Sequence, residues 1–165
     1  DAESSEGPGR LMPAQGSRRI RPEQKSLFRI LDANFNRALE GCRVIEDALR
    51  LGGRRSSAGD SRFYRLKSIR HRISFLRSRF GLRRLVSARD IYADPGAFRP
   101  HALEKRYRSY HSMIAANLQR LKESLRVIEE VSRALPVARG FSDAKRLRFM
   151  TYALEEHILL GRKSR

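Results

Sequence analysis

Apolar side chains recur at helical spacing along four stretches of this chain. From residue 23 to residue 52, a step of about 100° per residue gathers the apolar positions into one broad stripe, which is typical of an amphipathic helix. Gly52 and Gly53 follow the stripe, and glycine favours the end of a helix. The same reasoning predicts three more helices, over residues 61–80, 103–135 and 142–160. The chain is therefore predicted to be all-α.

Two other segments lack the helical period. Residues 1–22 are rich in glycine, proline, serine and charge, a composition that predicts a disordered leader. Residues 81–102 carry the sequence Asp-Pro-Gly and a second proline, which predicts a connector. Ser142 is expected to be the N-cap of the last helix. The predicted organisation is a leader (1–22) and a single domain (23–165) with a first half (23–80), a connector (81–102) and a second half (103–161).

The first and third predicted helices repeat each other. Residues 32–50 align without gaps on residues 115–133, and 9 of the 19 aligned positions are identical. At an offset of 83, Asn34, Arg37, Glu40, Arg43 and Glu46 correspond to Asn117, Arg120, Glu123, Arg126 and Glu129. In the helices that follow, at an offset of 78, Lys67 and Arg70 correspond to Lys145 and Arg148. A duplicated helix–loop–helix unit predicts a four-helix bundle of two helical hairpins related by a pseudo-twofold axis.

Two asparagines lie where the apolar stripe predicts a buried side chain. Asn34 falls within the stripe of the first helix, and Asn117 holds the same position in the third. A buried amide without hydrogen-bond partners costs about 1–3 kcal/mol, so its placement at both positions needs a reason. An arginine and a glutamate follow each asparagine at the edge of the stripe, and a small residue, Gly41 or Ser124, leaves space beside it. This arrangement indicates the wall of a pocket; the alternative is that each amide fixes the register of two packed helices.

The other repeated arginines and glutamates have a simpler interpretation. Arg43 with Glu46, and Arg126 with Glu129, are spaced i,i+3. This spacing places opposite charges side by side on a helix surface. The sequence therefore favours ordinary ion pairs for these four residues.

Composition narrows the class of protein. At 165 residues the chain fits one domain, and it is shorter than the roughly 200 residues that a (β/α)₈ barrel requires. With 36 basic and 18 acidic residues the net charge is +18, and six of the basic residues are lysines. This arginine excess favours a phosphate-bearing partner, with solvated surface charge as the alternative.

The single cysteine, Cys42, excludes an internal disulfide. No apolar run reaches the ~20 residues of a membrane span, so no membrane association and a cytoplasmic location are expected.

Familiar nucleotide and metal motifs are missing from the sequence. Neither a GxxxxGK(S/T) loop nor a GxGxxG turn occurs, although these glycine-rich signatures commonly cradle phosphates. The four histidines show no metal-ligand spacing. A nucleotide site therefore cannot be placed by motif.

Three segments of the chain resemble one known family. They are ILDANFNRALEGCRVIED (30–47), ARDIYADPG (88–96) and ANLQRLKESLRVIEE (116–130). They resemble the all-helical domain found alone or fused N-terminal to thiamine-phosphate synthase, a family regarded as alternative-type hydroxymethylpyrimidine phosphate kinases. The likeness covers about residues 27–160. It implies transfer of a phosphoryl group from ATP, with Mg²⁺, to a pyrimidine monophosphate. The synthase barrel has no counterpart in this sequence, so coupling of pyrimidine and thiazole is not expected.

The repeated polar residues supply candidates for the reaction that this resemblance implies. Phosphoryl transfer depends on positioning and on neutralising phosphate charge, an amide suits the edge of an aminopyrimidine, and magnesium binds through one or two carboxylates. The catalytic candidates are Arg37, Arg120, Lys67 and Lys145. The substrate-binding candidates are Asn34, Asn117, Arg70 and Arg148. The metal-binding candidates are Glu40, Glu123, Asp90 and Asp94.

Two alternative functions follow from other features of the sequence. Ile91 stands in the connector where the family carries threonine, and Pro95 follows Asp94. These departures motivate a non-catalytic helical adaptor that associates with a separate thiamine-phosphate synthase. Basic residues around much of the helix over 61–80 motivate docking on nucleic acid. The sequence carries no helix–turn–helix spacing or RNA-module signature, which argues against nucleic acid.

Overall fold

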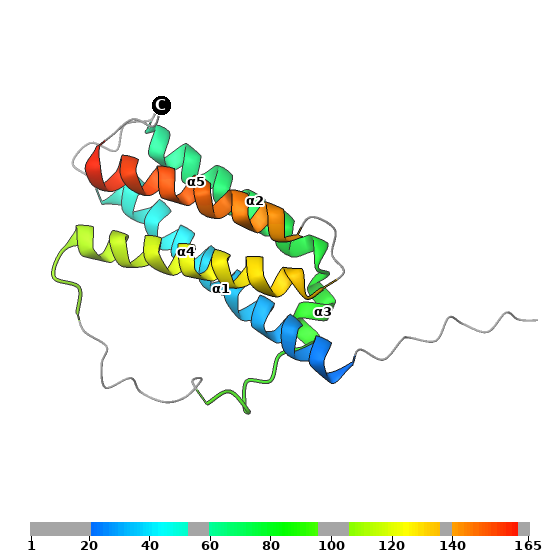
Figure 1. Ribbon diagram of the computed structural model, residues 1–165. Coiled ribbons are helices and arrows are strands. Elements are labelled where there is room, and N and C mark those ends of the chain that lie inside the picture. The colour runs from blue at the N-terminus through cyan, green and yellow to red at the C-terminus, as the bar shows by residue number, and fades with distance from the viewer. Residues whose placement is uncertain (1–20, 53–59, 96–105, 136–139, 162–165) are drawn as a thin grey trace, which may run out of the picture.

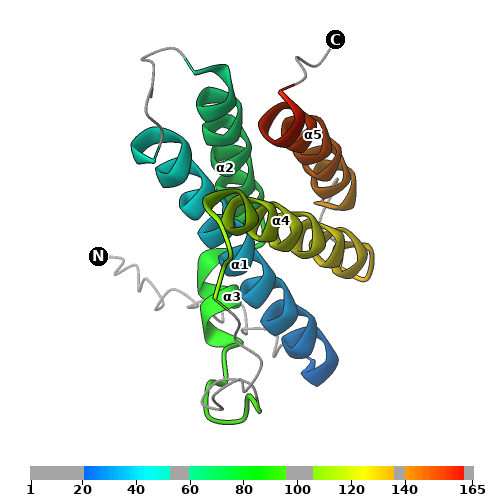
Figure 2. The ribbon, with the colours of Figure 1, turned by 90° about the vertical axis from the view of Figure 1, so that its left-hand side faces the viewer.

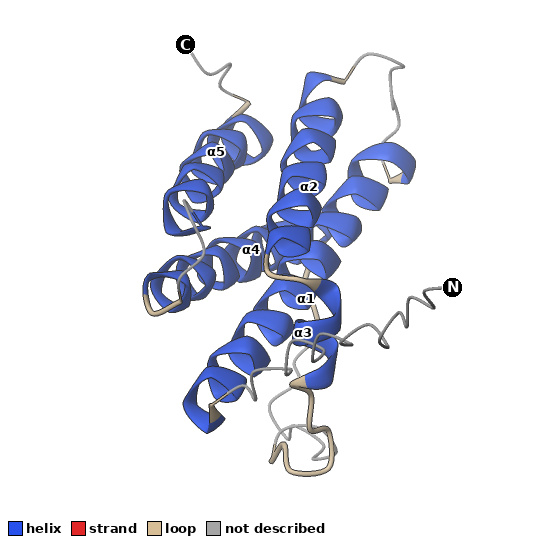
Figure 3. Cartoon of the chain, turned by 90° about the vertical axis from the view of Figure 1, so that its right-hand side faces the viewer, coloured by secondary structure: helices blue, strands red, loops and turns tan. Residues whose placement is uncertain are grey.

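The structure, a computed structural model, describes residues 21–52, 60–95, 106–135 and 140–161. Within these residues every regular element is an α-helix, and none is a strand (Figure 3). The helices are α1 (Pro22–Leu51), α2 (Ser61–Arg79), α3 (Leu82–Ser87), α4 (Tyr110–Arg133) and α5 (Gly140–Leu160). The predicted all-α class is therefore confirmed for the described part of the chain. Residues 1–20 of the predicted leader lie outside it.

The four long helices contact one another in a ring. α1 packs against α2 and α4, and α5 packs against the same two helices, while α3 packs against α1. Figures 1 and 2 show α2 and α5 side by side, with α1 and α4 crossing next to them. The crossing of α1 and α4 brings together the two repeated segments, residues 32–50 and 115–133.

The interior follows the predicted apolar stripes. Fully buried residues of α1 include Leu31, Phe35, Ala38, Cys42 and Ile45. Their counterparts on α4 include Leu118, Leu121, Leu125 and Ile128. Full burial of such a side chain contributes about 1.5–3 kcal/mol, so these stripes hold the crossing together. None of the described helices combines the length and the apolar character needed to span a lipid bilayer.

The two helices of the first half begin and end within one residue of their predicted bounds. α1 begins at Pro22, because proline lacks a backbone N–H and fits the first helical position. α2 begins at Ser61, where the carboxylate of Asp60 accepts a hydrogen bond from the backbone N–H of Arg62 at 2.9 Å. The side-chain hydrogen bond from Arg62 also lowers the pKa of Asp60. A proline at the start of α1, a cap at the start of α2 and a glycine just beyond the end of each helix thus explain why this half was predictable.

The predicted start of the third helix is wrong. α4 begins at Tyr110 rather than at residue 103, and residues 106–109 are not helical. The hydroxyl of Ser109 accepts a hydrogen bond from the backbone N–H of Ser112 at 3.1 Å, and the Ser112 hydroxyl accepts one from the Ser109 N–H at 2.9 Å. This reciprocal cap satisfies two backbone N–H donors and makes Ser109 the N-cap, so that α4 begins at Tyr110.

The predicted N-cap of the last helix is also wrong. Ser142 lies inside α5, which already begins at Gly140. Gly140 is buried, and a Cβ added to it would lie 3.0 Å from the ring of Phe80. The first turn of α5 is therefore packed into the core, where no side chain larger than hydrogen fits easily.

The connector predicted over residues 81–102 contains a helix that the sequence did not reveal. α3 follows Gly81, whose φ of 83° lies in the left-handed region that glycine adopts at little cost. Beyond this turn, Leu85 and Ala88 are buried and α3 packs on α1. Six residues are too few for an apolar period to become visible. Residues 96–102 of the connector lie outside the described part of the chain.

Candidate functional site between α1 and α4

Both repeated asparagines are buried in the crossing of α1 and α4. Asn34 is 6% exposed and Asn117 is 4% exposed. Each side-chain nitrogen donates to the backbone carbonyl four residues earlier, at 2.9 Å: Asn34 to Ile30 and Asn117 to Met113. Neither amide oxygen accepts a hydrogen bond from any residue that the structure describes. Each amide is thus anchored by its nitrogen and keeps an unused acceptor.

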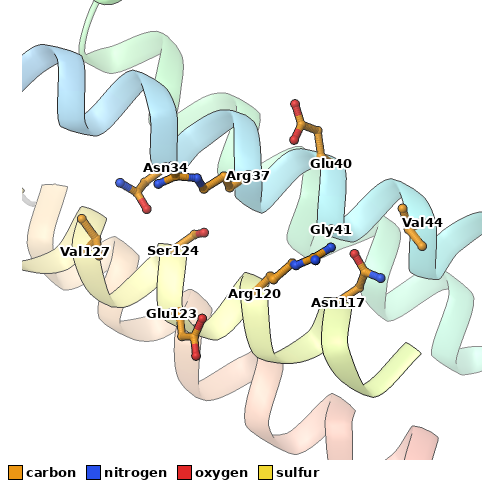
Figure 4. A pocket seen from close by; sticks show the side chains of 10 residues that line it. All are labelled: Asn34, Arg37, Glu40, Gly41, Val44, Asn117, Arg120, Glu123, Ser124 and Val127. Carbon is orange, nitrogen blue, oxygen red and sulfur yellow. The ribbon is translucent and has the colours of Figure 1, made fainter. Parts of the chain in front are cut away.

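A hollow of about 710 Å³ opens between α1 and α4 beside these amides (Figure 4). Its volume lies within the range of small-molecule sites, roughly 300–1,000 Å³. Its lining residues are Asn34, Arg37, Glu40, Gly41 and Val44 from α1, and Asn117, Arg120, Glu123, Ser124 and Val127 from α4. Each α1 residue is the repeat counterpart of one α4 residue, always at the offset of 83. The hollow is therefore built from five repeated pairs.

The helices approach closely at one of these pairs. A Cβ added to Gly41 would lie 3.2 Å from the backbone oxygen of Asn117, a distance at which the neighbour must give way. Its counterpart Ser124 is 3% exposed. Small side chains at a crossing allow two helix backbones to come near each other. The sequence predicted space at both positions, and both residues line the hollow.

The two arginines of the hollow have no carboxylate partner among the described residues. Arg37 and Arg120 make no hydrogen bond or ion pair with any described residue. This holds although each is followed, about one helical turn later, by a glutamate. In the view of Figure 4, both arginine side chains lie between the helices, whereas Glu40 and Glu123 point away from each other at opposite edges. Glu123 accepts a hydrogen bond from Gln119 at 2.7 Å. The guanidinium groups therefore remain available to an external anion.

The repeated arginines of the neighbouring helices α2 and α5 pair with buried glutamates instead. Glu46, 3% exposed on α1, accepts hydrogen bonds from Arg70 at 2.8 Å and from Arg43 at 3.4 Å. Arg70 thus links α2 to α1 through Glu46 and does not line the hollow. Lys67 is exposed and borders a separate, smaller hollow of about 160 Å³ together with these groups.

The second half pairs the corresponding residues, but with both oxygens of its glutamate, whereas one oxygen of Glu46 has no hydrogen-bond partner among the described residues. Glu129, 1% exposed on α4, accepts a hydrogen bond from Arg148 at 2.8 Å, and its other oxygen accepts from Arg126 at 3.1 Å. Burial alone would raise the pKa of Glu129, but the hydrogen bond and charge of Arg148 outweigh it, and the pKa is lowered. Lys145 is exposed on α5 and does not line the hollow. The predicted i,i+3 ion pairs are therefore confirmed, and each buried glutamate also recruits an arginine from the adjacent helix.

The four metal-binding candidates are not brought together. Glu40 and Glu123 border the hollow, whereas Asp90 and Asp94 are exposed beyond the end of α3. The Asp90 carboxylate accepts a hydrogen bond from the backbone N–H of Ala93 at 3.1 Å. No group of three histidine, cysteine, aspartate or glutamate side chains suited to a metal occurs among the described residues. Magnesium binding stays a prediction.

One family of proteins matches most of the chain. Residues 29–157 match the ThiD2 family, and this segment includes every residue that lines the hollow. The chain belongs to the ThiD2 family. The resemblance seen in the sequence is thereby confirmed.

This ThiD2-family chain is also similar to longer proteins. It is 37% identical over 133 residues to the thiamine-phosphate synthase of Gloeobacter violaceus, covering 81% of this chain and 36% of that protein. It is 35% identical over 151 residues to the thiamine-phosphate synthase of Thermosynechococcus vestitus, covering 92% of this chain and 38% of that protein. The chain thus spans little more than a third of the length of each of these two relatives. No solved structure matches it.

Sequence reasoning missed a charged cluster near the hollow of this ThiD2-family chain. Asp32, two residues before Asn34, is 3% exposed and accepts hydrogen bonds from Arg77 and Arg89, each with one at 3.2 Å. Burial alone would raise the pKa of Asp32, but both arginines outweigh it, and the pKa is lowered. The cluster ties α1 to the end of α2 and to the second residue after α3. Its partners are 45 and 57 residues away in sequence, so no local pattern could reveal it.

The hollow also has two hydrophobic lining residues, one from each helix. Val44 and Val127 line the hollow and were not among the predicted site residues, although the repeat itself marked them as an identical pair. Cys42 is fully buried, and burial raises the pKa of its thiol to about 12. This thiol is therefore unreactive and acts as a small core residue.

Proposed function

We propose that this chain is a phosphotransferase of thiamine biosynthesis, which converts hydroxymethylpyrimidine phosphate to its diphosphate with ATP and Mg²⁺. The observation that carries the proposal is the hollow, where two anchored amides stand beside two arginines that lack carboxylate partners among the described residues. Membership of the ThiD2 family and likeness to thiamine-phosphate synthases support the pathway. A cytoplasmic location belongs to the same proposal.

We further propose that the hairpins α1–α2 and α4–α5 are copies related by a pseudo-twofold axis through the hollow. The five repeated pairs that line it support this relation. So does the repeated ion pair within each hairpin, Glu46 with Arg70 and Glu129 with Arg148, at 2.8 Å in both. The four long helices then form a duplicated four-helix bundle.

The chemistry of the hollow suits this reaction. A phosphate oxygen of the pyrimidine monophosphate attacks the γ-phosphorus of ATP, the bond from that phosphorus to the β,γ-bridging oxygen breaks, and ADP leaves. The reacting groups are all anionic, so arginine forks that neutralise and orient them lower the barrier. Arg37 and Arg120 supply these forks. Mg²⁺ bound to the nucleotide phosphates needs one or two protein carboxylates, for which Glu40 and Glu123 at the edges of the hollow are the candidates.

A coupled assay for ADP tests the proposal. We expect the purified chain to release ADP when given ATP, Mg²⁺ and hydroxymethylpyrimidine phosphate, and Arg37→Ala or Arg120→Ala to lower kcat/KM by about 100-fold or more, because each removes a charge-assisted contact to phosphate. The matched control is Arg50→Ala, which removes an exposed arginine of α1 that pairs with Asp47 at 3.1 Å. Folded protein that releases no ADP above the blank would overturn the proposal.

A second candidate function is that of an adaptor for a separate thiamine-phosphate synthase. The observation that favours it is the exposure of two aromatic side chains, Phe75 on α2 at 68% and Phe149 on α5 at 55%. Aromatic side chains are enriched in protein interfaces. Co-sedimentation with such a synthase, reduced by Phe75→Ser and Phe149→Ser, would support this function, provided that ATP does not raise the melting temperature of the chain.

A further inference from the structure

The hollow has two ends with matching chemistry. Figure 4 shows the Arg37 side chain extending toward Asn34, with Ser124 and Val127 of the other helix at the same end. At the opposite end it shows Arg120 extending toward Gly41, close to Asn117. The 3.2 Å approach of a Cβ at Gly41 to the Asn117 backbone oxygen places these two residues together. Each end thus combines an asparagine and an arginine from one helix with a small residue and a valine from the other.

Each end offers the same pair of functional groups to a ligand. The asparagine nitrogen is anchored to its own helix, which leaves the amide oxygen as an acceptor that no described residue uses. The arginine offers several N–H donors and a positive charge without a carboxylate partner in the described part of the chain. A ligand that fits such an end carries an amino group for the amide oxygen and a phosphate for the guanidinium.

The two proposed substrates share that combination of groups. Hydroxymethylpyrimidine phosphate is an aminopyrimidine with a phosphate, and the six-membered ring of adenine is likewise a pyrimidine with an amino group beside a ring nitrogen. A duplicated binding element therefore matches a pair of substrates that resemble each other in the groups it recognises. A kinase also needs both substrates bound at once, with their phosphates near each other.

We propose that the hollow consists of two half-sites, Asn34–Arg37 and Asn117–Arg120, and that each takes one aminopyrimidine phosphate, so that ATP and the pyrimidine monophosphate bind together at opposite ends. This inference rests on the proposed function and deepens it. The half-sites differ at one lining position, because Ser124 brings a buried hydroxyl to the Asn34 end where Gly41 leaves bare backbone at the Asn117 end. This difference makes the two ends unequal, so each substrate has its own end.

Separate equilibrium titrations of the full chain test the half-sites. Isothermal titration calorimetry measures the Kd of hydroxymethylpyrimidine phosphate alone and of magnesium β,γ-imido-ATP alone, for the wild-type chain and for Arg37→Lys, Ser124→Ala and Arg120→Lys. Lysine keeps the charge but loses the planar fork. We expect Arg37→Lys to raise the Kd of one ligand about tenfold. The Kd of the other ligand should stay within about twofold of its wild-type value. Ser124→Ala should weaken the same ligand as Arg37→Lys, although it lies on the other helix, and Arg120→Lys should weaken the other ligand.

The outcomes separate this inference from the proposed function. Arg50→Lys serves as the control and should leave both Kd values within twofold, and circular dichroism verifies that each variant is folded. Equal weakening of both ligands by all three variants would overturn the half-sites, even if the chain turns over ATP. The half-sites would be upheld, and the kinase overturned, if Arg37→Lys and Ser124→Ala weaken one ligand and Arg120→Lys weakens the other while the chain releases no ADP in the coupled assay.

Discussion

The arginines of the hollow and the arginines around the buried glutamates occupy repeated positions in the same two hairpins, yet their partners differ. Arg70 and Arg148 each donate to a buried carboxylate at 2.8 Å. Arg37 and Arg120 have no such acceptor among the described residues. An arginine that satisfies a buried carboxylate is needed by the fold and cannot be spared for a ligand. Within the described residues, the repeat thus holds a stabilising set of arginines, Arg70 and Arg148, and a second set, Arg37 and Arg120, that we propose binds phosphate.

Falling pH should progressively neutralise three carboxylates that pair with arginines in the folded protein, Asp32, Asp60 and Glu129. The pKa values of Asp32 and Asp60 are lowered from an ordinary value of 3.8, and that of Glu129 from 4.5. A lowered pKa in the folded state means that the carboxylate stabilises the fold above its unfolded pKa and loses this contribution as pH falls through the folded pKa. We expect the free energy of unfolding to be level from pH 7 to about 5 and to fall progressively below about 4. Urea denaturation followed by circular dichroism measures it.

The control for this pH effect separates paired carboxylates from general charge repulsion. Asp32→Asn removes one of the three lowered groups and keeps the rest of the chain's charge. Its stability should therefore change less steeply between pH 5 and pH 2 than that of the wild-type chain. Identical slopes would contradict the role assigned to Asp32.

Glu129→Ala should produce the largest effect of a single substitution. It leaves Arg148, which is 12% exposed, without its buried partner, and loss of one member of a buried pair costs about 3 kcal/mol or more. Urea denaturation at pH 7 measures the change. Glu130→Ala is the matched control on the same turn; its carboxylate is 48% exposed, so it should cost less than about 1 kcal/mol. Equal effects of the two substitutions would show that Glu129 has no special part in the fold.

Asp32→Asn should have an intermediate effect on stability at pH 7. Its partners are more exposed than Arg148, at 20% for Arg77 and 40% for Arg89, so water replaces part of the lost interaction. We expect a loss of about 1–3 kcal/mol, again from urea denaturation. Asp47→Asn, which alters an exposed pair with Arg50, is the control and should cost less than about 1 kcal/mol. A loss at Asp32 no greater than at Asp47 would contradict the prediction.

The hollow's own arginines should matter least to the fold. Arg37→Ala and Arg120→Ala remove groups that make no hydrogen bond or ion pair with the described residues, so the free energy of unfolding should stay within about 0.5 kcal/mol of the wild-type value. This near-neutral result, set against the large loss of activity proposed above, would complete the comparison. A loss above 2 kcal/mol would instead assign these arginines to the stabilising set.

The sequence predicted the hollow better than it predicted the chain's helix boundaries. Asn34, Arg37 and Glu40 were placed on one flank by helical spacing alone, and the repeat supplied the other wall, because duplicated helices that pack on each other present equivalent faces. All six repeated residues line the hollow. The start of α4 was missed because its cap pairs two serines, Ser109 and Ser112, rather than the serine and glutamate that usually signal a capping box.

The cations of α2 and α5 were harder to place. Helical spacing shows which residues share a face, but it does not show which neighbour that face meets. Arg70 and Arg148 therefore looked like phosphate ligands, whereas the structure pairs them with Glu46 and Glu129. A buried glutamate on the facing helix, repeated at the same offset of 83, was the signal that could have reassigned them.

The bare backbone at Gly41 sets how closely α1 and α4 approach each other. A Cβ at this position would lie 3.2 Å from the Asn117 backbone oxygen, so a methyl group would push that carbonyl back by a few tenths of an ångström. Because Gly41 and Asn117 both line the hollow, the spacing of its two walls depends on the absence of a side chain at this one residue.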